Sequence, residues 1–218
     1  MAAHSTKSPQ IAALDLGRLV DGDPAELRAG GYLESVRFAD LVLPHLALPG
    51  AELVAARFRG LSADETDLKG ARLSEVELDQ VDLPVVRAAR SQWRDVRVTG
   101  RIGSLEAYEA DLRSVHFVGC KLSFVNLRGA ELLDVAFTDC VIEELDLVQG
   151  KARRVRFAGT RIGQLDVQHS ELHDVDLRGA ELEGITGVAH LRGTTVSPHQ
   201  LERLAPLFAH ELGIKVED

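Results

Sequence analysis

The chain is poor in the residue types that mark several protein classes. Aromatic residues make up only 5% of the chain. Only 2 of its 218 residues are cysteine, so a disulfide framework is excluded and a reducing, cytoplasmic setting is expected. No apolar run approaches the ~20 residues of a membrane-spanning helix. The N-terminus lacks the basic and apolar segments of a secretory signal. A net charge of −9 disfavours direct binding to nucleic acid, which requires a basic surface.

Sequence signals of catalysis and metal binding are also lacking. No phosphate-binding glycine loop, nucleophile elbow, kinase signature or zincin motif occurs. His169 and His173 lie four residues apart, but no further ligand accompanies them, and a metal site there is disfavoured. We therefore expect no catalytic residue, no metal and no cofactor.

A strict five-residue period runs through most of the chain. Every fifth residue from Leu33 to Val98 is apolar, which gives 14 positions. One residue is then missing near Thr99–Arg101, and the series resumes at Ile102 for 17 more apolar positions, ending at Leu182. The residue two places earlier is never charged. Neither a helix, with period 3.6, nor a strand, with period 2, yields this pattern, whereas a coil with four flat sides does.

The phenylalanines support the four-sided interpretation. Five of the seven occupy central positions and fall into one of the four columns that a 20-residue coil creates: Phe38, Phe58, Phe117, Phe137 and Phe157. Coils spaced by ~4.8 Å would stack these rings in the offset geometry that aromatic pairs favour. We predict nearly eight coils, a rod of ~37 Å, and a tightened corner or small offset at the missing residue.

The units resemble the pentapeptide-repeat family, whose signature is A(D/N)LXX. The closest matches begin at Ala71, Ala110, Val125, Ala130, Val175 and Ala180. The signature is degenerate here, as in actinobacterial-type members, because Arg, Glu, Lys or His often replaces Asp or Asn. The resemblance implies an all-β fold, a right-handed quadrilateral β-helix, over residues 31–185.

The two ends of the chain are expected to cover the solenoid. Residues 1–30 are interpreted as an N-terminal tail and cover, disordered up to Gln10. Residues 186–218 are interpreted as a short C-terminal α-helical cap that begins with a capping box at Ser197, kinks or splits at Pro206, and returns as a strand at 214–216. Its apolar stripe is Leu201, Leu204 and Phe208. This stripe can cap the last coil, serve as a homodimer contact, or do both, so a monomer and a homodimer stay open.

Two further sets of residues share columns. Cys120 and Cys140 are predicted to stack in adjacent coils as small buried core residues rather than as a disulfide. Asp67, Glu106, Asp146 and Asp166 share one outward column that Arg87 interrupts, which predicts an acidic face.

These features favour a non-enzymatic protein that presents a rigid surface to an unidentified protein partner, with no contact to a membrane. The alternative follows from the resemblance, since some relatives bind DNA gyrase by imitating duplex DNA and thereby modulate sensitivity to quinolones or toxins. Residues 31–185 carry 19 Lys+Arg and 26 Asp+Glu, a net charge of −7. Duplex DNA of the same length carries about 22 negative charges, so the imitation of DNA is poor overall.

Overall fold

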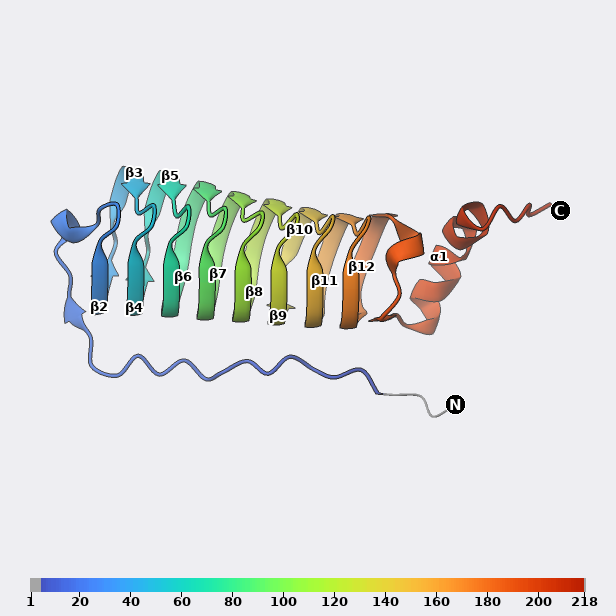
Figure 1. Cartoon of the computed structure of the whole chain (residues 1–218), viewed down its shortest axis with the longest axis horizontal. Coiled ribbons are helices and arrows are strands. Elements are labelled where there is room, and N and C mark those ends of the chain that lie inside the picture. The colour runs from blue at the N-terminus through green and yellow to red at the C-terminus, as the bar shows by residue number, and fades with distance from the viewer. Residues whose placement is uncertain (1–4, 218) are drawn as a thin grey trace.

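The computed structural model describes residues 5–217, most of which form a parallel β-solenoid of about nine coils (Figure 1). Its strands and helices in chain order are β1 (Val20–Asp21), the 3-10 helix η1 (Pro24–Glu26), β2 (Tyr32–Ala39), β3 (Val42–Ala47), β4 (Glu52–Arg59), β5 (Ser62–Asp67), β6 (Arg72–Arg87), β7 (Gln92–Glu106), β8 (Asp111–Asn126), β9 (Glu131–Thr138), β10 (Val141–Asp146), β11 (Lys151–Asp166), β12 (Glu171–Thr186), η2 (Val188–His190), β13 (Thr194–Thr195) and α1 (Pro198–Glu211). The right-handed quadrilateral β-helix expected from the sequence is the architecture of the chain.

The strands pair in parallel with those of the next coil, and most residues pair with the residue 20 positions further along the chain. Leu33 pairs with Leu53, and Phe38 pairs with Phe58. The coil that contains Gly100 has one residue fewer, and its register shifts between Thr99 and Arg101. The missing residue therefore produces a tightened corner, as predicted. The solenoid has more coils than the nearly eight predicted, because β1 pairs with β2 at one end and β13 pairs with β12 at the other.

One apolar core fills the solenoid from Leu33 to Leu191. The phenylalanine column stacks as two ladders. Ring centroids lie 5.0 Å apart for Phe38–Phe58, 4.8 Å for Phe117–Phe137 and 5.0 Å for Phe137–Phe157. Leu78 and Val98 fill the column between the ladders.

Three of the four corners use left-handed backbone. One corner does so with no glycine at all, at Ser35, Ala55, Glu75, Asp95, Ser114, Asp134, Arg154 and Asp174, with φ between 48° and 59°. The fourth corner has no positive φ within the described chain, and Pro44 and Pro84, whose rings fix φ near −65°, lie there. Pro49 lies at another corner, directly before Gly50 with its φ of 68°, so proline occupies two kinds of corner in this coil.

The chain ends differ from the sequence-based expectations. Residues 1–4 lie outside the described residues, while residues 5–10, expected to be disordered, run as an extended segment along the solenoid (Figure 1). Helix α1 continues through Pro206 without splitting. The predicted strand at 214–216 is wrong, because those residues have no strand partner. The division into 1–30, 31–185 and 186–218 stays a prediction, and the sheet extends beyond both limits through β1 and β13.

Candidate functional site

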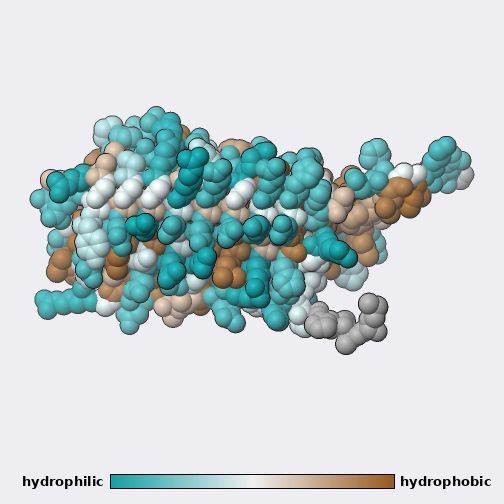
Figure 2. Space-filling model, viewed as in Figure 1, coloured by the Kyte–Doolittle hydropathy of each residue, from teal (hydrophilic) through white to brown (hydrophobic). Residues whose placement is uncertain are grey.

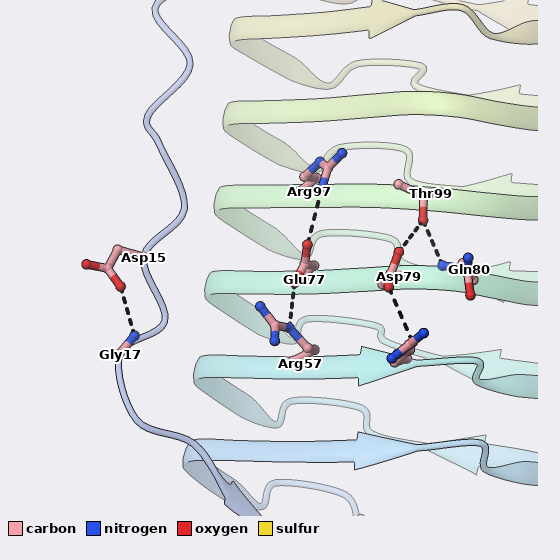
Figure 3. Close-up of polar contacts among 9 residues, drawn as sticks. Asp15, Gly17, Arg57, Glu77, Asp79, Gln80, Arg97 and Thr99 are labelled. Carbon is pink, nitrogen blue, oxygen red and sulfur yellow. Dashed lines mark hydrogen bonds and ion pairs between the residues drawn. The ribbon is translucent and has the colours of Figure 1, made fainter.

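Outward side chains form ladders along the solenoid, because equivalent residues of successive coils lie one strand spacing apart. Arg57 Nε lies 2.6 Å from Glu77 Oε2, and Arg97 Nη1 lies 3.3 Å from Glu77 Oε1 (Figure 3). On the same coils, Thr99 Oγ1 donates a 2.9 Å hydrogen bond to Asp79 Oδ1. Glu77 thus bridges the arginines of the coils before and after it, in a column that also contains Arg37 and Arg156.

Most carboxylates in the column predicted to be an acidic face form hydrogen bonds that stabilise the fold. Asp67, Asp146 and Asp166 each accept a hydrogen bond from the backbone N–H two residues later, at 3.0, 2.8 and 3.0 Å. This is the Asx-turn geometry that stabilises a corner. Arg128 Nη2 also lies 2.8 Å from Asp146 Oδ2. Glu106 shares the column, in which it pairs with Arg87 on one side and Asn126 on the other. The acids therefore stabilise corners rather than form a free acidic surface.

Cys120 and Cys140 are buried and unlinked. The Cys120 thiol donates to the carbonyl of Val98 at 3.2 Å, and the Cys140 thiol donates to the carbonyl of Thr138 at 3.3 Å. The hydrogen bond with Cys140, together with burial, raises the pKa of the Cys120 thiol. The same hydrogen bond lowers the pKa of the Cys140 thiol. Both thiols are only 1% exposed, so reagents in solution reach this column only when the solenoid opens.

We expect both thiols to resist alkylation in the folded protein. Iodoacetamide should react with them only as fast as the solenoid unfolds, and at the rate of free thiols once it is denatured in urea. Mass spectrometry of the intact protein at successive times measures both rates. Rapid labelling of the native protein would show that the column is open to solvent.

The extended N-terminal segment docks on the glycine-free corner of the solenoid. Its backbone N–H groups donate to side chains of that corner: Lys7 to Asp174 Oδ1 at 3.1 Å, Gln10 to Asp134 Oδ1 at 2.8 Å, and Ala12 to Ser114 Oγ at 3.0 Å. Leu16, which belongs to the same segment, is buried. At the far end, the hydroxyls of Thr6 and Thr195 are in hydrogen-bond contact. The segment thus runs from the last coil to the first (Figure 1).

Asp134 is the central anchor of this segment. Its carboxylate also forms two 2.6 Å hydrogen bonds with the guanidinium of Arg154. Burial opposes ionisation of Asp134, but Arg154 and the Gln10 N–H outweigh it and lower the pKa of the carboxyl group. The stability that this carboxylate contributes is therefore present above its unfolded-state pKa, and is lost as the pH falls through the lower folded-state pKa.

Replacing Asp134 with alanine should release the N-terminal segment. The change leaves the half-buried Arg154 and the Gln10 N–H without a partner, so we expect the free energy of unfolding to fall by about 2–3 kcal/mol. Hydrogen exchange should show faster exchange of the Gln10 amide. Ser114→Ala is the control, because it removes only the Ala12 anchor and should cost about 1 kcal/mol. Unchanged exchange at Gln10 in Asp134→Ala would contradict this role.

The C-terminal helix covers the last coil. The predicted capping box is present: Ser197 N–H donates to Gln200 Oε1 at 2.7 Å, and Gln200 N–H donates to Ser197 Oγ at 3.2 Å. The Gln200 side chain also donates to the carbonyls of Leu177 and Ala180, at 2.6 and 2.8 Å. Of the predicted stripe, Leu204 is buried, Phe208 packs against the core, and Leu201 is 51% exposed.

The histidines do not gather into a site. The ring centroids of His169 and His190 lie 4.9 Å apart, and His173 Nε2 lies 3.7 Å from Asp174 Oδ2. Among residues 5–217, no group of three or more His, Cys, Asp or Glu side chains could hold a metal ion.

A groove of about 710 Å³ lies on the face formed by β8, β9, β11 and β12. A smaller hollow along β6, β7 and β8 continues it, because both are lined by Asp111 and Arg113. The residues before β13 close the C-terminal end with Ala189, His190 and Arg192. The five-residue pattern did not reveal this groove, because the pattern fixes which residues point outward but not which outward rows form walls.

Two family profiles match separate parts of the solenoid. Residues 51–84 match the profile described as pentapeptide repeats in eight copies, and residues 105–186 match the pentapeptide repeat region. The two matches cover more than half of the chain, and they agree with the observed coil of four five-residue sides. The chain belongs to the pentapeptide-repeat family.

Solved pentapeptide-repeat structures are similar to this chain in fold. HetL, a pentapeptide repeat protein involved in regulation of heterocyst differentiation in the cyanobacterium Nostoc, is 20% identical, with 74% of this chain and 87% of HetL covered and a TM-score of 0.34. Full-length QnrB1, a plasmid-mediated fluoroquinolone resistance protein, is 18% identical, with 90% and 95% covered and a TM-score of 0.32. No curated protein matches the sequence. These likenesses concern the type of fold and carry no argument about the role of this pentapeptide-repeat chain.

No helix within residues 5–217 is both long enough and apolar enough to cross a membrane. Figure 2 shows mostly hydrophilic residues over the solenoid and hydrophobic residues gathered on the C-terminal extension. Exposed apolar residues there include Leu201, Leu212, Ile214 and Val216.

Proposed function

We propose that this pentapeptide-repeat protein acts without catalysis, by presenting a rigid surface to a protein partner. The uninterrupted core carries this proposal. It fills the coil from Leu33 to Leu191, while hydrogen bonds between coils fix the backbone, so outward side chains stand in columns of constant spacing. Columns of mixed charge suit recognition of a protein, which relies on complementary charge rather than on a deep pocket.

A face-by-face substitution series tests the proposal. The full chain is immobilised and exposed to cytosol of its source cell, and retained proteins are identified by mass spectrometry. Four variants then reverse the exposed charges of one solenoid face each, which leaves the core unchanged. We expect a retained protein whose binding falls by about tenfold or more for one face only. Retention of no protein by the folded chain, or equal loss for all four faces, would contradict the proposal.

The alternative is that the solenoid imitates duplex DNA and binds gyrase or another topoisomerase. The surface gives it little support. The net charge of −7 over residues 31–185 is far from the ~22 charges of DNA of that length. Three of the four acids of the predicted acidic face, Asp67, Asp146 and Asp166, accept hydrogen bonds from the backbone, and Asp146 is also paired with Arg128.

We accordingly expect gyrase activity to be unaffected. Supercoiling assays with purified gyrase, with and without a quinolone, should give the same rates in the absence and in the presence of micromolar protein. A change in supercoiling or in quinolone inhibition would favour the alternative and argue against a different protein partner.

The C-terminal extension is the candidate homodimer contact. Helix α1 caps the last coil through Gln200 and Leu204, yet Leu212, Ile214 and Val216 remain 72%, 56% and 81% exposed. Burial of such residues against a second copy would be favourable by the hydrophobic effect. Light scattering after size exclusion distinguishes the two states: a dimer that Leu212→Glu dissociates supports the contact, and a monomer at all concentrations shows that α1 acts only as a cap.

A further inference from the structure

The groove on β8–β12 has two walls of different charge. Its first wall carries Asp111, Glu131, Lys151 and Glu171, and its second wall carries Arg113, Leu133, Arg153 and His173, each in register from coil to coil. With Arg192 at the closed end, the groove contains four cationic side chains and three carboxylates. In a protein of net charge −9, this is a concave surface with a positive excess.

The cations of the second wall differ in how far they are already neutralised. Arg113 is bonded to Asp111 at 2.9 Å, and on the first wall Lys151 lies 3.4 Å from Glu131. Among the residues that the structure describes, Arg153 and Arg192 form no ion pair, and both are exposed. These two guanidinium groups are therefore free to bind an anionic group from another molecule, and guanidinium favours bidentate contacts with carboxylates.

The register of the coils places the two free arginines two coils apart. Arg153 pairs with His173 in the next coil. β13 pairs with β12 through Val175 and Thr194, and Arg192 lies in the turn directly before β13, so it stands one coil beyond His173 along the solenoid axis. Two coils span about 9.6 Å, which is nearly the ~10 Å rise of three residues in an extended chain. An extended peptide with carboxylates at every third residue would match this spacing.

The N-terminal segment shows that the solenoid binds an extended chain at this spacing. Lys7 and Gln10, three residues apart, bond to Asp174 and Asp134, which lie two coils apart on the adjacent corner. The groove runs alongside this corner, since Arg153 and His173 precede the corner residues Arg154 and Asp174 in sequence.

We propose that the β8–β12 groove binds an extended acidic segment of a partner protein, with carboxylates three residues apart on Arg153 and Arg192 and an apolar side chain on Leu133. The assignment rests on the proposed function, because it names the surface and the partner chemistry of that same interaction. Recognition occurs through side chains, since the backbone groups of the face are already bonded between coils.

Fluorescence anisotropy with defined peptides tests the groove on the full chain. The probe is a fluorescein-labelled nonapeptide of serine, isoleucine and glutamate with glutamate at every third position, at low ionic strength to limit screening. A second peptide has the same composition with its glutamates adjacent. We expect the spaced peptide to bind about threefold or more tightly than the adjacent one, because only its carboxylates match the coil spacing.

Charge reversal then locates the binding site. R153E/R192E should weaken binding of the spaced peptide by about tenfold or more, since two attractive pairs become repulsive. R101E/K121E is the matched control, because Arg101 and Lys121 are exposed in adjacent coils of another face and carry the same total charge. It should change binding by less than about twofold.

Three results would overturn the groove assignment: no saturable binding of the spaced peptide at ~1 mM, equal binding of the spaced and adjacent peptides, or equal loss in the two double variants. If the groove fails but the substitution series assigns a retained protein to another face, the proposed function stands. If peptide binding follows the expected pattern but no protein is retained from cytosol, the groove stands and the proposed function does not.

Discussion

Replacing Phe137 with alanine is expected to lower the free energy of unfolding by about 3–5 kcal/mol. Phe137 is 1% exposed and is stacked between Phe117 and Phe157, with ring centroids at 4.8 and 5.0 Å. The coil cannot collapse around the missing ring, because its backbone is fixed by hydrogen bonds to both neighbouring coils. Urea denaturation followed by circular dichroism measures the change.

Phe137→Leu is the matched control for this prediction. Leucine keeps most of the buried volume and loses mainly the stacking, so the cost should be about 1 kcal/mol. Equal stability of the alanine and leucine variants would show that the column is loosely filled. The ladder would then contribute little to the stability of the solenoid.

Gly100→Ala is expected to have an effect of similar size for a different reason. Gly100 forms the shortened corner with φ +115°, a backbone conformation that other residues adopt only with strain. A Cβ at this position would lie 2.2 Å from the carbonyl oxygen of Val81 and 2.5 Å from its nitrogen. Because both are backbone atoms, the coils must move apart, and we expect a loss of about 3–5 kcal/mol.

Gly119 provides the control at the equivalent corner of the next coil. It also has a positive φ, of 60°, but nothing lies within 4 Å of a Cβ placed there. Gly119→Ala should therefore cost only about 1 kcal/mol of backbone strain. Similar unfolding free energies for the two variants would mean that the shortened corner is not under steric constraint.

Much of the fold could be predicted from the sequence because its core repeats locally. A buried central residue recurs every five positions, so Leu33, Phe117 and Leu182 could be assigned to the interior without any knowledge of long-range contacts. The capping box at Ser197 was visible for the same reason, since its two hydrogen bonds join residues three apart. Where a structural feature depends on residues close together in the sequence, the sequence is sufficient to predict it.

The failures occur where a residue's partner is far away in the sequence. Nothing near Gln10 indicates that its N–H meets Asp134, 124 residues later, so the sequence predicts disorder for residues 1–10. The column of Asp67, Asp146 and Asp166 was assigned correctly, but its acids bond to the backbone of their own corners. A shared column does not reveal whether a carboxylate points to solvent or to an N–H.

The sequence alone determined the interior of this protein: the square coil, the aromatic column and the coil that is one residue short. These follow from burial, which selects apolar side chains at fixed intervals and is independent of what lies outside. Only the tertiary structure decided the exterior, namely which corner holds the N-terminal segment and which rows enclose a groove with the exposed side chains of Arg153 and Arg192. Outward residues are constrained by neighbours one coil away rather than by the repeat itself, so their roles emerge only when the coils are stacked.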